Sequence, residues 1–216
     1  DPQWKKYRKI IDKYDFITYV KNNRAYYKFW EILHTYRNGL FKNKHTIYSL
    51  QLCEAPGGFI LSLLKYIQNL NENIKIKILT MSLLKENTPS YNMSQLNLFK
   101  ENLQILNGID SQGDINNLYN IQYIKQHCRS FDFITCDGGF DEGENYNLKE
   151  QLHYNLILNE IIYSLELQSK NGCFILKIFD VFTNTTVNLI YLLTLCYNTV
   201  YMHKPLIKDD KHNSLA

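Results

Sequence analysis

The stretch Gln51-Leu52-Cys53-Glu54-Ala55-Pro56-Gly57-Gly58-Phe59 decides the fold of this chain. It follows an apolar run at 46–50, which is typical of a buried strand, and leads into an apolar helical pattern at 59–66. Proline restricts the turn, and the two glycines let the backbone approach a ligand closely. The helix that follows would offer free N–H groups to a carboxylate or to hydroxyl groups. We interpret the stretch as a cofactor-binding loop; the alternative is an ordinary corner between strand and helix.

The composition is that of a globular protein. The chain has 216 residues, of which 45% are hydrophobic and 21% charged. This length predicts a single domain over 1–216, with a basic helical extension at 1–40 and an α/β core at 45–216. The net charge of +3 is too small to argue for nucleic acid, but eight Lys and Arg residues fall within the first thirty positions. Such a run suits phosphate contacts and equally suits a solvated helix face.

The five cysteines predict neither disulfides nor zinc. They include no Cys-x-x-Cys pair, and no cluster of His and Cys offers a metal site. A reducing compartment is therefore expected, in the nucleus or the cytoplasm, or in the host cytoplasm if the protein is viral. No apolar stretch is long enough to span a membrane, and no signal peptide opens the chain.

Strand and helix patterns alternate along the chain from residue 47 onward. Strands are predicted at 47–53, 75–81, 132–136, 173–179 and 199–203, and helices at 3–37, 58–69, 93–106, 148–168 and 184–197. This alternation predicts parallel strands joined by right-handed crossovers, in a doubly wound α/β sheet. Ligands of such sheets bind beyond the carboxyl ends of the strands, near the switch point of the topology.

Two predicted strands end in an ionisable residue. The strand at 131–136 leads into Asp137-Gly138-Gly139, and the strand that begins at Gly172 runs into Lys177. Asp137 alone is also typical of a turn before glycine. Lys177 has large apolar neighbours, and a lysine is seldom buried unless it is paired. Because both strands would end near the cofactor loop, we expect Asp137 and Lys177 to form a functional pair there.

Together these features resemble the FtsJ/RrmJ-type S-adenosylmethionine-dependent RNA 2′-O-methyltransferases. Within them the chain is most similar to the mRNA cap-specific branch that methylates the second transcribed nucleotide. The segments that carry the resemblance occur in the family's order at 23–33, 52–59, 113–115, 131–141, 172–182, 204–205 and 213–214. The resemblance implies a Rossmann-like methyltransferase fold, with the family's last strand missing from this chain.

The family's catalytic set is Lys-Asp-Lys-Glu. The resemblance assigns its first three members to Lys28, Asp137 and Lys177, whereas the expected Glu is replaced by Leu215. A ribose 2′-hydroxyl must lose its proton as it attacks a methyl group, and a lysine can accept it when burial or a nearby cation favours the neutral amine. Lys177 is thus expected to be the general base, Lys28 to supply the second positive charge, and Asp137 to steer the amine.

The resemblance also implies a cofactor site for S-adenosylmethionine. Its expected residues are Glu54, Ala55, Pro56, Gly57, Gly58, Phe59, Thr80, Asp114, Ile115 and Asp137. Glu54 is a candidate partner for the amino group of the cofactor and Asp114 for its adenine, although Asp114 could also serve as a turn residue after glycine. The stretch at 80–82 lacks the acidic residue that often holds the cofactor ribose in relatives.

The expected substrate is RNA, most specifically capped mRNA. The expected substrate-binding residues are Arg24, Lys28, Lys204, Asn213 and Ser214. A partner subunit or a further domain would complete the fold, and no membrane is expected as a partner. Two alternatives stay open: an inactive domain that binds RNA or a partner, favoured by the missing Glu, and the same chemistry on ribosomal or transfer RNA.

Overall fold

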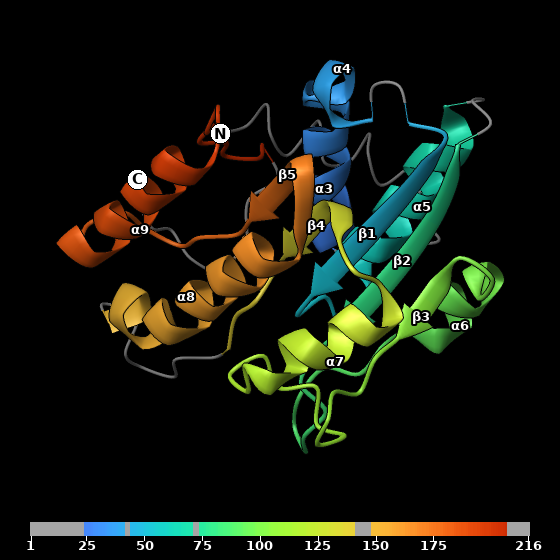
Figure 1. Cartoon of the computed structure of the whole chain (residues 1–216), viewed down its shortest axis with the longest axis horizontal. Helices are drawn as coiled ribbons and strands as arrows, with labels where there is room; N and C mark the ends of the chain where they lie inside the picture. Colours follow the sequence, from blue (N-terminus) through green and yellow to red (C-terminus); the bar gives the residue numbers. More distant parts are fainter. Residues whose placement is uncertain (1–23, 42–43, 71–73, 141–147, 207–216) are drawn as a thin grey trace, which may run out of the picture.

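A computed structural model describes residues 24–41, 44–70, 74–140 and 148–206, which form a parallel sheet between two layers of helices (Figure 1). The elements in chain order are α3 (Arg24–Thr35), α4 (Arg37–Leu40), β1 (Thr46–Leu52), α5 (Gly58–Asn69), β2 (Lys75–Met81), α6 (Met93–Leu96), the short 3-10 helix η1 (Asn97–Phe99), β3 (Leu103–Ile105), α7 (Tyr119–His127), β4 (Phe131–Cys136), α8 (Lys149–Leu167), β5 (Gln168–Leu176) and α9 (Asn184–Cys196). The alternation predicted from residue 47 onward is confirmed.

The sheet has five strands in the order β3-β2-β1-β4-β5, and all of its pairings are parallel. The chain builds β1, β2 and β3 toward one edge and then returns to place β4 on the other side of β1. The switch point therefore lies between β1 and β4, where Leu52 is in register with Cys136. Hence the residues that follow these two strands, beginning with Cys53 and Asp137, leave the sheet side by side.

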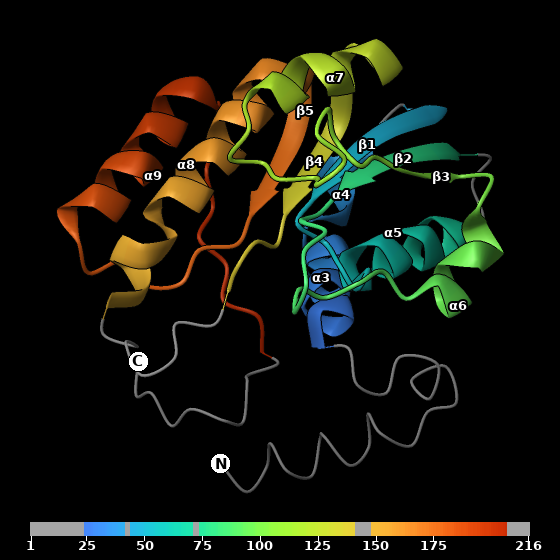
Figure 2. The same ribbon diagram turned by 90° about the horizontal axis from the view of Figure 1, so that it is seen from below.

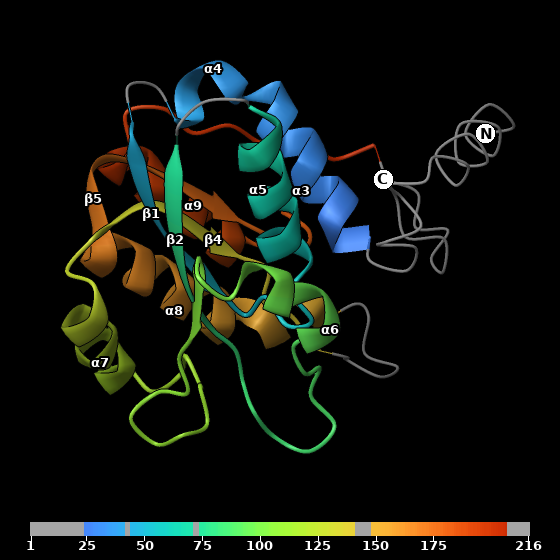
Figure 3. The same cartoon turned by 90° about the vertical axis from the view of Figure 1, so that its right-hand side faces the viewer.

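Alternating side chains of the strands bury both faces of the sheet. Ile76 and Ile78 of β2 pack with α3 and α5, whereas Leu79 and Met81 pack on the opposite face with α7 and α8. Figures 2 and 3 show these two layers, with α9 outside the sheet beside α8. Because both faces are covered, the central strands have nearly continuous apolar sequences. None of the helices in the described part of the chain is long and apolar enough to cross a membrane.

Helix α3 runs parallel to α5. The ring of Phe29 stacks on Phe59 near the start of α5, with centroids 4.4 Å apart, and His34 meets Tyr66 further along at 5.1 Å. The first turn of α3 therefore lies beside the start of α5, at the carboxyl edge of the sheet. This part of the predicted basic extension packs into the core; residues 1–23 of the predicted helix at 3–37 lie outside the described residues.

The predicted helix at 93–106 is wrong in its second half. Helical turns end at Phe99, and β3 follows, where Leu103 is in register with Ile78 and Ile105 with Thr80 of β2. The apolar residues of this segment stand two apart, a strand period, but three residues are too few to show it against the helical turns before them. Helix α7 was not predicted.

The predicted strand at 199–203 is also wrong, and β5 ends at Leu176, three residues before the predicted end. In the described part of the chain no strand lies beyond β5. The segment 199–206 instead crosses to α3, where His203 Nε2 lies 3.2 Å from Glu31 Oε1 and the N–H of Leu206 donates to the same carboxylate. A sequence rich in β-forming residues becomes a strand only where a neighbouring strand supplies hydrogen bonds, and within the described residues this segment pairs with no strand. A pocket of about 680 Å³ lies between this segment, β5, α9 and the end of α3.

Candidate active site at the switch point

The loop after β1 forms the centre of the candidate site. Cys53 has a positive φ of 59°, which is uncommon for a residue with a side chain, and its N–H donates to the carbonyl of Met81 at 2.8 Å. A cis peptide bond joins Ala55 to Pro56. Gly57, with φ 110°, precedes the first residue of α5. The loop thus turns sharply from strand to helix and presents the start of α5 at the carboxyl edge of the sheet, as the sequence predicted.

Glu54 is a buried carboxyl group within this loop. Its side chain is 2% exposed, and Oε1 accepts a hydrogen bond from the Thr135 hydroxyl of β4 at 2.8 Å. Its second oxygen, Oε2, has no hydrogen-bond partner among the described residues. Burial, together with the negative charge of Asp137, raises the pKa of Glu54 well above its usual value. An acid in this state would gain from a positively charged ligand.

Asp137 and Lys177 meet at the ends of the neighbouring strands β4 and β5. The Lys177 amine lies 2.9 Å from Asp137 Oδ1, and it also donates to the backbone carbonyl of Asp137 at 2.9 Å. Both side chains are partly exposed, 32% for Lys177 and 20% for Asp137. The amine also lies 5.3 Å from the centre of the Phe179 ring. The structure therefore brings together the pair that the sequence predicted, open to solvent beside the loop at 53–58.

Helix α8 holds both loops of the site in place, a contribution that the sequence analysis missed. The Gly138 N–H donates to Glu160 Oε1 at 3.1 Å, and the Phe140 N–H donates to His153 Nε2 at 3.1 Å. Glu150 accepts from the N–H of Phe182, in the loop after β5, at 3.0 Å. The three side chains occupy the buried face of α8. Their spacing on an otherwise apolar helical stripe was a signal that could have identified them, because buried polar groups need partners.

Glu160, like His153, is fully buried. It is 0% exposed, and its Oε2 has no hydrogen-bond partner among the described residues. Burial raises its pKa to about 8, against the opposing effects of Lys177 and of the Gly138 N–H. Three carboxyl groups, those of Glu54, Asp137 and Glu160, interact electrostatically with the amine of Lys177, and a cationic ligand would favour their ionised forms.

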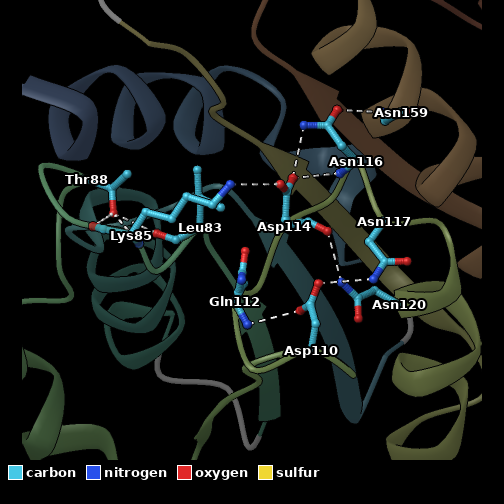
Figure 4. A network of polar contacts seen from close by, with 10 residues as sticks. All are labelled: Leu83, Lys85, Thr88, Asp110, Gln112, Asp114, Asn116, Asn117, Asn120 and Asn159. Atoms are coloured by element: carbon cyan, nitrogen blue, oxygen red, sulfur yellow. Dashed lines mark hydrogen bonds and ion pairs between the residues drawn. The ribbon is translucent and has the colours of Figure 1, made fainter.

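Asp114 lies in a separate, exposed loop that follows β3 (Figure 4). Its Oδ1 accepts from the N–H and the side-chain amide of Asn116 at 2.9 and 3.0 Å, and its Oδ2 lies 3.6 Å from the Lys85 amine. The first of these bonds is the turn-forming contact that was the alternative reading of Asp114. Fully buried Asn120 links the loop by donating to the Asp114 carbonyl and accepting from the Ile109 N–H. Asn120 was also missed.

Three predicted cofactor residues have their side chains in the core. Phe59 stacks on Phe29, and Ile115 is 3% exposed, so each could meet a ligand only through its backbone. The Thr80 hydroxyl is fully buried and donates to the Gln51 carbonyl at 2.8 Å. The cofactor role of these residues stays a prediction.

The predicted RNA-binding residues are spread over two described segments. Arg24 and Lys28 lie in the first turns of α3, next to the start of α5, whereas Lys204 is exposed in the segment 199–206. Asn213 and Ser214 lie outside the described residues, as does Leu215 at the position of the expected Glu. Among the described residues, no group of three His, Cys, Asp or Glu side chains is arranged to hold a metal ion.

The family model of FtsJ-like methyltransferases matches residues 21–215. The chain belongs to the FtsJ-like methyltransferase family. The resemblance drawn from the sequence segments is therefore confirmed, and with it the α/β fold.

Curated relatives of this FtsJ-like chain carry cap-specific names. It is 28% identical over 194 residues to "Cap-specific mRNA (nucleoside-2'-O-)-methyltransferase 2" of Drosophila melanogaster, covering 84% of this chain and 27% of that protein. It is 31% identical to the protein of the same name from Pongo abelii, covering 84% and 25%. Over 105 residues it is 37% identical to "Cap-specific mRNA (nucleoside-2'-O-)-methyltransferase 1" of Danio rerio, covering 46% and 13%. The chain spans about a quarter of the length of the first two relatives.

A solved structure of a Plasmodium falciparum protein described as a ribosomal RNA methyltransferase has a similar fold. The TM-score is 0.58, the sequence identity 19%, and the match covers 84% of this chain and 90% of that one. At this identity the likeness supports the fold and carries no information about substrate.

Proposed function

We propose that this chain is the methyltransferase core of an RNA 2′-O-methyltransferase that acts next to the 5′ cap of mRNA. The observation that carries the proposal is the Asp137–Lys177 pair, with its 2.9 Å contact at the switch point beside the cofactor loop. Membership of the FtsJ-like family supports methyl transfer, and the cap-specific names of the relatives support the substrate. A capped mRNA substrate also points to an intracellular protein, in nucleus or cytoplasm.

The site fits S-adenosylmethionine, the methyl donor of FtsJ-like methyltransferases. When bound, this cofactor supplies an electrophilic methyl group carried on a positively charged sulfur atom. Glu54 Oε2 lacks a partner among the described residues, and a cationic ligand beside the Asp137 carboxylate would favour ionisation of Glu54, whose pKa is raised by burial. These groups favour a cation, and the start of α5 offers N–H groups to a carboxylate. We propose that residues 54–58 hold the amino-acid end of the cofactor and that Asp114 lies at its adenine end.

Lys177 is the residue best placed to move a proton. Its amine is partly exposed, so a ribose hydroxyl can reach it, and two bonds to Asp137 fix its position. As a free amine Lys177 would accept the 2′-hydroxyl proton while the oxygen forms its bond to the methyl carbon. General base catalysis of this kind contributes about 10² to 10⁴ in rate. We propose that most of the remaining acceleration comes from holding the reactants in line.

The start of α3 is the proposed contact for the RNA backbone. Arg24 and Lys28 lie at the carboxyl edge of the sheet, on the same side as the cofactor loop. Cationic side chains there would neutralise phosphates and release counterions, so affinity should fall with salt. Arg8 and Lys9, two further basic residues of the amino-terminal run, lie outside the described residues.

Methyl transfer from radiolabelled S-adenosylmethionine to short RNA tests the proposal. Capped RNA should be methylated on the ribose of a nucleotide near the cap, and uncapped RNA much more weakly. Equal methylation of both would overturn the cap-specific assignment in favour of a general RNA 2′-O-methyltransferase. No transfer to any RNA, with RNA still bound, would instead support the inactive binding domain.

A salt titration of RNA binding tests the contact surface. Arg24→Ala should weaken binding and reduce the salt dependence by about one phosphate contact. Arg37→Ala is the matched control, because Arg37 lies in α4, at the far end of the α3–α4 segment. Equal losses in both variants would show that α3 makes no localised contact with RNA.

A further inference from the structure

One peptide unit of the site is held from two sides. The carbonyl of Asp137 accepts from the Lys177 amine at 2.9 Å, and the N–H of Gly138, in the same peptide unit, donates to Glu160 Oε1 at 3.1 Å. A peptide unit is planar, with its C=O and N–H pointing in opposite directions. A rotation of this unit would break both bonds together. The buried carboxyl group is therefore mechanically linked to the catalytic amine.

Gly138 has no space for a side chain because of Glu160. A Cβ atom built at Gly138 would lie 2.3 Å from Glu160 Oε1 and 3.0 Å from a methyl group of Leu156. The glycine after Asp137 thus lets the peptide approach the carboxyl group closely. Glu160, more than twenty positions further along the chain, therefore explains why a glycine follows Asp137 at the end of β4.

Burial of Glu160 lowers the stability of the fold. The side chain is 0% exposed, and Oε2 has no hydrogen-bond partner among the described residues. An apolar residue would avoid that desolvation, but it would leave the Gly138 N–H without its acceptor. The hydrogen bond that it accepts from the Gly138 N–H thus explains why a carboxyl group occupies this buried position.

We propose that Glu160 is a positioning residue for methyl transfer: its Oε1 fixes the Asp137–Gly138 peptide, which in turn fixes the Lys177 amine. This inference rests on the proposed function, in which Lys177 is the general base. Glu160 touches neither RNA nor cofactor in this role. Its neutral form retains an acceptor oxygen for the Gly138 N–H, so positioning requires no charge.

Positioning requires no charge, but the charge of Glu160 makes the rate of methyl transfer dependent on pH. The ionisable groups that act on it or respond to it are Lys177, Asp137, Glu54, Cys53 and Cys136. Burial raises the pKa of Glu160 to about 8, so near neutral pH it is mostly uncharged. Above that pH the negative charge of Glu160 would favour positive charge in the site and so oppose the formation of a free base. Activity should therefore gain less from rising pH in the wild type than in a variant without this charge.

Three variants separate positioning from charge and from packing. Glu160→Gln keeps the acceptor oxygen, Glu160→Leu removes it, and Glu166→Gln is the matched control on an exposed part of α8. We expect Glu160→Leu to lower kcat by at least about tenfold with little change in KM for the cofactor. Glu160→Gln should restore kcat and raise the relative activity above about pH 8, the pKa of Glu160. The Glu166→Gln control should resemble the wild type.

The proposal fails if folded Glu160→Leu has wild-type kcat, or if Glu160→Gln loses as much activity as the Leu variant. A second measurement needs no activity. In ¹H–¹⁵N spectra the Gly138 amide of the wild type should shift with a midpoint near 8, and in Glu160→Gln it should not shift. A Gly138 amide in the wild type that exchanges with solvent hydrogen as fast as an unprotected amide would overturn the link between the two residues, even if Glu160→Leu does not fold. An inactive wild type with the expected amide titration would instead count against the proposed function alone.

Discussion

The two sides of the candidate site differ in how completely their acidic side chains are hydrogen-bonded. On one side Glu54 and Glu160 are buried beneath Lys177, and each has an oxygen without a partner among the described residues. On the other side, the exposed loop after β3 gives every carboxylate oxygen of Asp110 and Asp114 a hydrogen bond or an ion pair (Figure 4). The buried side holds acids with incomplete hydrogen bonding at a cost in stability, whereas the acids of the loop are fully partnered.

This difference indicates where chemistry takes place. Removing an acid from water with an incomplete set of partners costs on the order of 1–3 kcal/mol or more, and folds lose that stability mainly at functional sites. Hydrogen bonds in a solvated loop cost little and add little. Substitutions on the buried side should therefore change activity and pH dependence strongly. Those in the loop should act on local stability and only weakly on the reaction.

The largest effect is expected for Lys177→Ala. Loss of the general base should lower kcat by about 10³-fold, roughly 4 kcal/mol in the barrier. Lys177→Arg should not restore it, because a guanidinium group does not release its proton at working pH. Calorimetry should show cofactor binding largely intact, and Lys170→Ala, at an exposed lysine of the same strand, is the control. Activity of Lys177→Ala within about tenfold of the wild type would refute the assignment.

The second effect is the stability of Glu160→Gln as a function of pH. The folded protein keeps the Glu160 proton up to a pKa of about 8, whereas the unfolded chain releases it near 4.5, so this group lowers stability as pH rises through that window. The Gln variant lacks this loss. Its free energy of unfolding should match the wild type near pH 4 and exceed it by about 4 kcal/mol at pH 7.5, three units above 4.5, at ~1.4 kcal/mol per unit.

Denaturant unfolding at both pH values measures this difference. Glu166→Gln should show no comparable trend, because Glu166 is largely exposed and pairs with Lys125 at the surface. A constant difference between Glu160→Gln and the wild type across the range would show that folding does not raise the pKa of Glu160.

Third in size is the effect of Gly57→Val on the cofactor loop between the two sides. Gly57 has φ +110°, and a Cβ there would lie 2.9 Å from Leu96 Cδ1, so the turn must move. Affinity for S-adenosylmethionine should fall at least about 100-fold, ~2.7 kcal/mol, as measured by calorimetry. Gly39→Val is the control, since nothing lies within 4 Å of its Cβ. Unchanged affinity in a folded Gly57→Val protein would show that the cofactor does not bind at this loop.

The smallest effect is expected for Asn120→Ala in the exposed loop. The N–H of Ile109 loses its acceptor and the Asp114 carbonyl its donor, which should cost about 1–2 kcal/mol of stability. Because the loop only shapes the site, kcat should change less than about tenfold. Asn116→Ala, at an exposed side chain of the same loop, should cost less than about 0.5 kcal/mol. A loss of kcat as large as that of Lys177→Ala would erase the distinction between the two sides.

The sequence by itself determined the centre of this protein. The strand, the loop at 53–58 and the helix 58–69 have local signals that agree with one another: an apolar run, a proline, two glycines and a helical stripe. The positions of Asp137 and Lys177 at strand ends also follow from local pattern, because parallel strands bring their carboxyl ends to one edge. Where each signal is complete within about ten residues, as at β2, the predicted and observed limits agree.

Tertiary structure alone decided the rest. β3 forms because β2 offers its edge to Leu103 and Ile105, whereas 199–203 meets the carboxylate of Glu31 by way of His203 rather than a strand edge. The parts played by Glu160 and Asn120 likewise depend on partners 22 and 11 positions away. A local pattern records how a segment can fold and which face it buries. It does not record which distant backbone group or carboxylate will become the hydrogen-bond partner of that segment. That partner is decided only when distant parts of the chain pack together.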